Sequence, residues 1–141
     1  MSLGAIVALA ERNGVELPVT LIVSGKVVTG ITTPKFRFDE WFVEIMRRAE
    51  LNRGKPLAIT GEMPELSPAQ LEKVRSQAAQ WDRDNPGVPM DLKVVCLRNA
   101  EVVVSANSAN RLPFLVVRLD QVSAYTIGDI SRRNPLLAEQ D

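Results

Sequence analysis

Apolar and polar residues alternate most regularly over residues 15–24 of the chain. A period of two with one apolar face is typical of a β-strand that is buried on one side. The Ser-Gly-Lys tripeptide at 24–26 has the composition of a tight turn, and a second apolar run follows over residues 27–33. The pattern predicts a β-hairpin here. Gly30, inside the second strand, indicates a bend, because a glycine lets a strand curve sharply.

Three other segments place their apolar residues at helical spacing. The first, residues 3–12, ends at an Asn-Gly pair that suits a helix C-terminus. The second follows Pro34, with acidic residues near its start and basic residues near its end, as the helix dipole favours. The third begins at residues 67–70, where Ser-Pro-Ala-Gln combines an N-cap, a proline at the first position and a capping-box glutamine. The apolar face of the second helix consists of Phe38, Trp41, Phe42, Ile45, Met46 and Ala49.

The last third of the chain returns to β-type patterning. Apolar residues at 92–97 and 102–104 flank a polar break, and a loop of small polar residues is expected over 105–111. Two more strands are expected at 112–119 and 122–127, separated by a short polar turn.

These elements predict an α+β domain built on a small, strongly bent, five-stranded antiparallel barrel with a short N-terminal helix. Strands of this length cannot cover a core as a flat sheet, whereas a barrel encloses the apolar faces and removes most unpaired edges. Two helices are inserted between the second and third strands, at about residues 34–87. The single domain spans residues 1–130, and the polar tail at 131–141 is expected to be flexible. We expect the inserted helices to pack on the barrel through Trp41, Phe42, Ile45, Leu71, Val74 and Trp81.

The composition fits one globular domain and argues against several functions. Hydrophobic side chains make up 45% and charged ones 24% of the 141 residues, which is enough for a core. Lys+Arg and Asp+Glu both number 17, so the formal net charge is zero. Dedicated nucleic-acid binders usually carry a positive excess, so such binding would need a local patch. Residues 2–10 are apolar but fall short of the ~20 residues that span a bilayer, and they lack a basic start, so we expect a cytoplasmic protein without a membrane span.

Residue types that support catalysis and metal binding are scarce. The absence of histidine removes the commonest general base and the commonest metal ligand. Cys96 is the only cysteine, which excludes an internal disulfide and a cysteine-based zinc cage. Because Cys96 lies in an apolar run, a buried small hydrophobe is favoured over a nucleophile. We therefore expect no enzyme, no cofactor and no bound metal.

Charged residues form two candidate ligand or interface sites. Arg118 and Asp120 flank the last tight turn, where they either bind a ligand, line the pore of an oligomer, or pair with each other across the hairpin. A basic cluster near the end of the second helix either meets an anion or a phosphate backbone, or forms a solvated helix end. The cluster consists of Arg47, Arg48, Arg53 and Lys55. Glu40 and Glu44 lie on one face of the same helix, and surface charge, with Glu44 paired to Arg48, is the favoured interpretation.

The two β blocks resemble the two halves of an Sm-like fold. Residues 17–32 (LPVTLIVSGKVVTGIT) are similar to the first half, and residues 92–127, with LKVVCLRNAEVV and FLVVRLDQVSAYTIG, are similar to the second. Arg118 matches the arginine of that family's final Arg-Gly pair, but Leu119 replaces the glycine. The family's Asp-Asn positions for uridine have no counterpart, because the helical insertion begins there. The resemblance implies the barrel without the family's RNA pocket.

A second resemblance is to the gas vesicle accessory protein U family. The order and spacing of VTLIVSGKVVTGITT, FDEWF, VCLRNAEV and VVRLDQVSAYTIG, within residues 15–130, are similar to that family. The resemblance implies an accessory or assembly factor and carries over no catalytic residue.

These observations favour a non-enzymatic structural or interaction protein that self-associates or docks another protein. The alternative is a nucleic-acid-binding Sm-like module that uses the basic cluster and Arg118. Residues 112–119 are apolar at six of eight positions, and an unpaired strand of this kind is a template for a second chain. We therefore expect a homo-oligomer, either a dimer or a ring, formed partly by edge-strand pairing. If the inserted helices cover that edge instead, the protein is a monomer.

Overall fold

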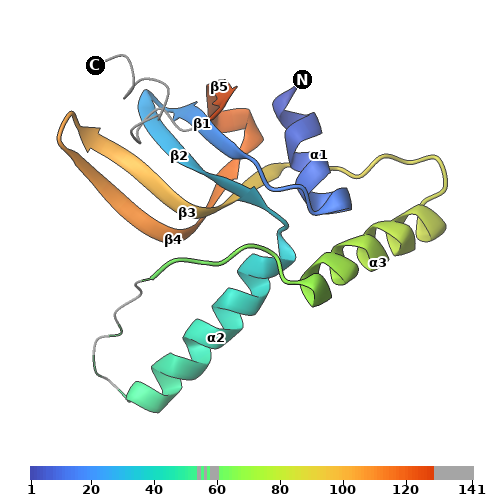
Figure 1. Ribbon diagram of the computed structural model, residues 1–141, viewed down its shortest axis with the longest axis horizontal. Helices are drawn as coiled ribbons and strands as arrows, with labels where there is room; N and C mark the ends of the chain where they lie inside the picture. Colours follow the sequence, from blue (N-terminus) through green and yellow to red (C-terminus); the bar gives the residue numbers. More distant parts are fainter. Residues whose placement is uncertain (54, 56, 58–60, 129–141) are drawn as a thin grey trace.

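The computed structural model of the chain describes residues 1–53, 55, 57 and 61–128. The predicted α+β class is confirmed, with one helix before the first strand and two helices between the second and third strands (Figure 1). The predicted tail at 131–141 lies outside the described residues. In chain order the elements are α1 (Leu3–Asn13), β1 (Pro18–Val23), β2 (Lys26–Thr33), α2 (Phe36–Asn52), α3 (Pro68–Asp84), β3 (Val94–Ser105), β4 (Ser108–Arg118), the short 3-10 helix η1 (Leu119–Gln121) and β5 (Val122–Ile127).

The strands form one five-stranded antiparallel sheet in the order β4-β3-β2-β1-β5. Strand β1 pairs with β2 and β5, and strand β3 pairs with β2 and β4. Within the described residues no ladder joins β4 to β5, so the sheet is open and these strands are its two edges. The antiparallel sheet is therefore established, whereas its closure into a barrel remains a prediction.

Helix α1 packs on one face of the sheet and forms the core with it. Its ends are set by local signals, since the Ser2 hydroxyl accepts a backbone N–H of the first turn and Gly14 ends the helix at a φ of 68°. Ile6 is fully buried in one cluster with Leu21 of β1 and Leu97 of β3. Burying each side chain of this size contributes ~1.5–3 kcal/mol. The contact between α1 and the sheet is thus the main apolar core.

The predicted β1–β2 hairpin is present and has the expected turn. Ser24 and Gly25 adopt positive φ values of 51° and 77°, a geometry that matches the twist of paired strands. The register of β2 against β3 shifts at Gly30. A Cβ at Gly30 would lie 2.9 Å from the Cβ of Leu97. This glycine therefore allows β3 to approach closely at the same point where the strand is irregular.

The β3–β4 hairpin departs from the sequence-based expectation. The predicted loop at 105–111 is wrong, because β4 begins at Ser108 and pairs with β3 directly after a tight turn. The predicted polar break also lies inside β3, where Arg98 and Glu101 are buried. Arg98 is paired with Glu16, and Glu101 forms an ion pair with a guanidinium of the neighbouring strand. Strand β3 therefore runs through these polar positions, because the buried charges of Arg98 and Glu101 are both paired.

The inserted helices pack on the body of the protein less fully than predicted. Val74 of α3 is buried, and α3 packs against α1. Phe42 of α2, in contrast, is 50% exposed, so the expectation that it is buried is wrong. Helix α2 contacts the sheet near its start, where Phe38 and Trp41 meet Phe114 of β4, and the rest of the helix projects away (Figure 1). Of the residues predicted to pack on the barrel, four are half-buried: Trp41, Ile45, Leu71 and Trp81.

Candidate interaction site

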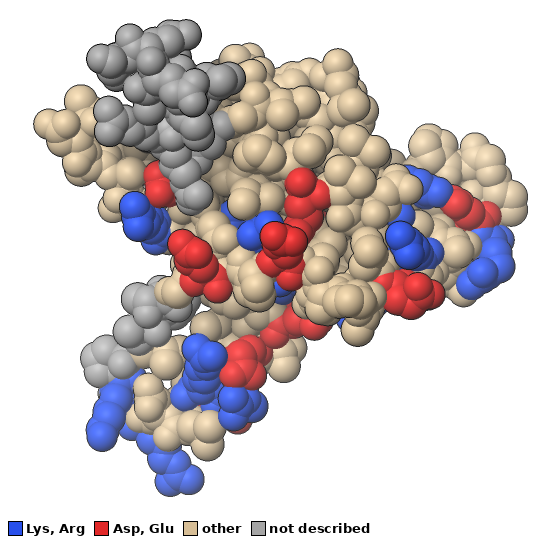
Figure 2. All heavy atoms as spheres, viewed as in Figure 1, with Lys and Arg blue, Asp and Glu red and all other residues tan. Residues whose placement is uncertain are grey.

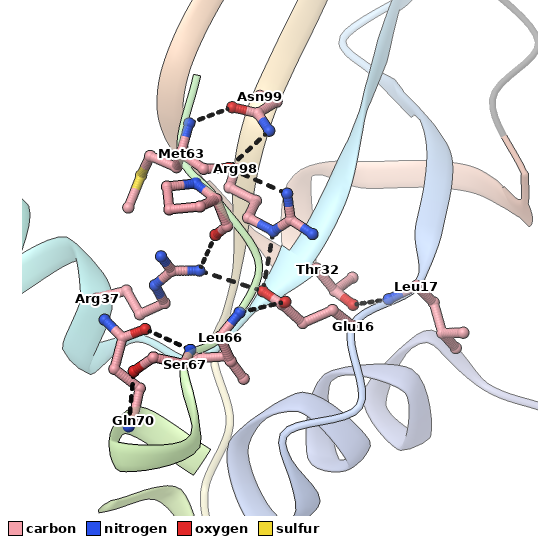
Figure 3. Close-up of polar contacts among 11 residues, drawn as sticks. Glu16, Leu17, Thr32, Arg37, Met63, Leu66, Ser67, Gln70, Arg98 and Asn99 are labelled. Atoms are coloured by element: carbon pink, nitrogen blue, oxygen red, sulfur yellow. Dashed lines mark hydrogen bonds and ion pairs between the residues drawn. The ribbon is translucent and has the colours of Figure 1, made fainter. Parts of the chain in front are cut away.

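A buried polar network joins the helical insertion to the sheet, and Glu16 lies at its centre (Figure 3). Arg98 Nε donates to Glu16 Oε2 at 3.0 Å, and Arg37 Nη1 lies 3.5 Å from the same oxygen. The backbone N–H of Leu66 donates to Glu16 Oε1 at 3.2 Å. All three charged side chains are almost fully buried, so the two guanidinium groups depend on this carboxylate for charge balance.

The same network holds the segment before α3 against β3. Arg98 Nη1 and Asn99 Nδ2 both donate to the carbonyl of Met63, at 3.1 and 2.9 Å. The backbone N–H of Met63 donates in return to Asn99 Oδ1 at 2.7 Å, and Arg37 Nη1 donates to the carbonyl of Pro64 at 2.8 Å. Asn99 adopts a φ of 52°, which places it at the irregular point of the strand. The network therefore holds both the start of α2 and the segment before α3 against the sheet.

This network is structural rather than catalytic. Both carboxylate oxygens of Glu16 already accept hydrogen bonds from the chain. Arg37 Nε is buried without a hydrogen-bond partner among the described residues, and burial lowers the pKa of Arg37. The sequence analysis missed the network; its signal was the Arg98-Asn99 pair, which interrupts an otherwise apolar strand.

The remaining titratable groups give little support for catalysis. Cys96 is buried in β3, and burial raises the pKa of its thiol to about 12, so the reactive thiolate is suppressed at neutral pH. Burial also raises the pKa of Glu11, whose carboxylate accepts the backbone N–H of Lys35 at 2.7 Å. No group of three or more metal-ligating side chains occurs in the described part of the chain. None of the helices in that part is long and apolar enough to cross a membrane.

Arg118 and Asp120 are brought together at the end of β4. Arg118 Nη2 donates to Asp120 Oδ2 at 2.6 Å, and both side chains are exposed. The pair spans the start of η1, the turn that separates β4 from β5. Of the three interpretations, pairing across the turn is the one with direct structural support. The pair therefore lies at the connection between the two edge strands of the sheet.

The predicted basic cluster lies at the far end of α2, as Figure 2 shows, on a different element from Arg118. Arg47 and Arg48 both donate to Glu44, at 2.6 and 3.2 Å, and chiefly the hydrogen bond from Arg47 lowers the pKa of Glu44 to about 2. Arg53 and Lys55 are exposed and form no ion pair with any described residue. Two of the four cations thus share one carboxylate of the same helix, which offsets one of their two charges.

Among the described residues, the outer sides of β4 and β5 have no strand partner, and exposed apolar side chains lie on both strands. On β4, Leu112 and Val116 are exposed, while Phe114 between them lies under α2 at 5.3 Å from Phe38, centroid to centroid. On β5, Tyr125 and Ile127 are exposed, and Ile127 is 51% accessible. Unpaired N–H and C=O groups beside apolar side chains form a template for another strand.

A cleft lies beside the β5 edge, between this strand and the start of α1. The hydroxyl of Tyr125 donates to the carbonyl of Met1 at 2.6 Å and closes one end of it. Its lining is mainly apolar and consists of Leu3, Gly4, Leu119, Val122, Ser123, Ala124 and Tyr125. An apolar side chain from a strand added to β5 would find such a surface next to the new ladder.

Comparison with models of protein families, with curated proteins and with solved structures gave no match.

Proposed function

We propose that this chain is a non-enzymatic interaction protein that assembles by pairing the free edge of β4 in one copy with the free edge of β5 in the next. The single observation that carries the proposal is the open sheet, whose two edges are both exposed and partly apolar. Edges of this kind are a liability in a monomer, and a second chain is one way to cover them.

The two edges belong to different strands, so their pairing is head-to-tail. Such an interface leaves one free β4 and one free β5 on every dimer, and further copies add until a ring closes or a filament grows. Val116, 38% exposed on β4, and Ile127 on β5 would both lose solvent contact in the new ladder. The apolar cleft beside β5 would take up a side chain of the incoming strand.

The Sm-like barrel is the finer fold that we propose for this sheet. The order of a short helix, five strands and a 3-10 turn between the last two strands supports it, together with the similarity of residues 17–32 and 92–127 to that family. A β4–β5 ladder between copies would satisfy the edges that the open sheet leaves unpaired within one copy.

The resemblance to the gas vesicle accessory protein U family supports a role as an accessory factor in gas vesicle assembly. An assembly factor that works by association needs interfaces and no catalytic centre, which agrees with the scarcity of catalytic groups. The alternative, nucleic-acid binding through the basic cluster, has weaker support, because Glu44 pairs with both Arg47 and Arg48 and offsets one of their two charges.

Light scattering across a dilution series at micromolar concentration tests the proposed pairing. We expect a mass above the 15.6 kDa of one chain. A lysine at Val116 or at Ile127 should lower that mass, since a charge on an edge strand opposes pairing. The matched control is Val104→Lys, because Val104 is 63% exposed but lies on β3, which is not an edge.

Mixing the two edge variants gives the sharpest result. The Ile127→Lys chain keeps an intact β4 and the Val116→Lys chain keeps an intact β5, so together they should form one head-to-tail pair. A wild-type mass of 15.6 kDa at every dilution would overturn the proposal, and so would edge variants that behave like the control.

A further inference from the structure

Helix α2 carries a second apolar surface that is exposed among the residues that the structure describes. From the first turn of α2 to its C-cap residue Arg53, which has a φ of 36°, five exposed residues are spaced three, four, three and four positions apart: Asp39, Phe42, Met46, Ala49 and Arg53. This spacing is that of the a and d positions of a coiled coil, which face a partner helix. Phe42 is 50% and Met46 48% exposed. We call these five residues the α2 seam.

The seam lies beside the face by which α2 is anchored to the sheet. Phe38 and Trp41 hold the start of the helix on Phe114, and the buried network fixes Arg37, the residue directly before Phe38. The helix is therefore a rigidly based arm that projects from the body of the protein (Figure 1). Because the base of the helix is held by these contacts, the seam has a fixed orientation relative to the sheet, which favours binding to one specific partner surface.

The charges at the two ends of the seam have opposite sign and no partner within the described chain. Glu44 pairs with Arg47 and Arg48, and Glu40 pairs with Lys73, so those groups are already used. Asp39 and Arg53 form no ion pair with any described residue.

We infer that the α2 seam pairs with the α2 seam of a second copy in antiparallel orientation, about a two-fold axis near Met46. In this orientation Asp39 of each copy lies near Arg53 of the other, and Phe42, Met46 and Ala49 form the apolar centre. A parallel pair would instead place Asp39 beside Asp39 and Arg53 beside Arg53. The charge pattern therefore selects both the partner, a second copy, and its direction.

This interface is distinct from the proposed β4–β5 pairing and does not depend on it. It is isologous, so it closes after two copies, whereas the edge pairing is head-to-tail and continues. A protein with both interfaces would form rings or filaments that are cross-linked in pairs through their α2 arms. Anionic membranes and nucleic acids suit the seam less well, since Asp39 and the exposed Glu50 lie along it.

Disulfide trapping in a Val116→Lys background tests the seam apart from the sheet edges. Met46→Cys should cross-link two copies on mild oxidation, because it lies at the axis. The matched control is Leu51→Cys, which is 72% exposed on the opposite face of the same helix and should not form the disulfide. The native Cys96 does not interfere, since it is buried.

The orientation is tested with Asp39→Cys and Arg53→Cys. Their equimolar mixture should form a disulfide between the two variants, whereas each alone should not. In an antiparallel pair, equivalent residues at one end of the seam lie about 20 Å apart at 1.5 Å per residue, and a disulfide needs Cα atoms within about 7 Å.

Charge reversal tests the seam independently. The dimer dissociation constant is measured by sedimentation in the same Val116→Lys background. Asp39→Arg or Arg53→Asp should each raise the dimer dissociation constant about tenfold, because the two-fold axis repeats every charge contact. A mixture of the two variants should restore the wild-type constant. The proposal is overturned if Leu51→Cys cross-links as fast as Met46→Cys, if Asp39→Cys cross-links alone, or if neither reversal changes the constant.

Discussion

Replacing Glu16 with glutamine tests the buried network that positions the helical insertion. The substitution preserves the shape of the side chain but removes the negative charge that faces Arg98 and Arg37. Glu16 Oε2 accepts from Arg98 at 3.0 Å, and all three side chains are almost fully buried. The glutamine amide also presents N–H groups where one oxygen accepted a hydrogen bond. Two guanidinium groups then lie in the interior without a counter-charge.

The expected loss of stability is large on the scale of a small domain. Removing one partner of a buried ion pair typically costs ~3–5 kcal/mol, since the remaining charge stays desolvated. Domains of this size have ~5–15 kcal/mol of stability in total. With a urea m-value of about 2 kcal/mol/M, the unfolding midpoint of Glu16→Gln should fall by about 2 M.

Urea unfolding followed by circular dichroism and tryptophan fluorescence measures the effect. The control is Glu65→Gln, since Glu65 is exposed and makes no ion pair with any described residue; its stability should change by less than ~0.5 kcal/mol. The double variant Glu16→Gln/Arg98→Gln should be more stable than the sum of the single losses predicts, with a coupling of at least ~1 kcal/mol. A Glu16→Gln loss below ~1 kcal/mol, or a coupling near zero, would refute this account of the network.

The other predictions concern single residues and RNA. Gly30→Ala should destabilise the fold by ~1–3 kcal/mol in the same urea assay, because the new Cβ would crowd Leu97, and an unchanged midpoint would contradict the close approach. Cys96 should react with a thiol reagent at neutral pH only on unfolding; fast labelling of the native protein would show that the thiol is accessible. Glu44, with its pKa lowered to about 2 chiefly by Arg47, should stabilise α2 fully above pH 4.5 and lose that contribution as the pH falls towards 2; an NMR titration midpoint near 4.5 would be evidence against the pairing. Uridine-rich RNA should not bind tightly at physiological salt, and a steeply salt-dependent, tight complex would instead support the nucleic-acid alternative.

The sequence alone determined the features that depend on a few neighbouring residues. The Ser-Gly turn of the first hairpin and the capping box of α3 are both present as predicted, with Ser67 accepting from the Gln70 backbone N–H at 3.1 Å. Each of these requires only the dihedral preferences and hydrogen-bonding reach of adjacent side chains. The Arg118–Asp120 pair, whose members lie two residues apart, was one of three interpretations that the sequence left open.

Periodicity identified the apolar stripe of α2 but not what would cover it. The spacing of Phe42 with its neighbours predicts a helix with one apolar face, and the helix is present. Whether that face meets the sheet depends on where the chain leaves β2 and how far the helix extends past β4. The structure anchors only the first turns on Phe114, so Phe42 is left exposed.

The buried network and the open sheet were decided only by the tertiary structure. Glu16 and Arg98 are separated by 82 positions, and nothing local to either residue indicates that they meet. The sequence analysis expected an edge strand at residues 112–119, within β4, but the apolar pattern of the strands does not give the order in which they pair, so β5 as the other edge was decided by the tertiary structure. Period-two and period-3.6 patterns record which side of an element avoids water. Which other element covers that side is fixed by the path of the whole chain. For the edge strands and the α2 seam, no described element of the same chain covers it.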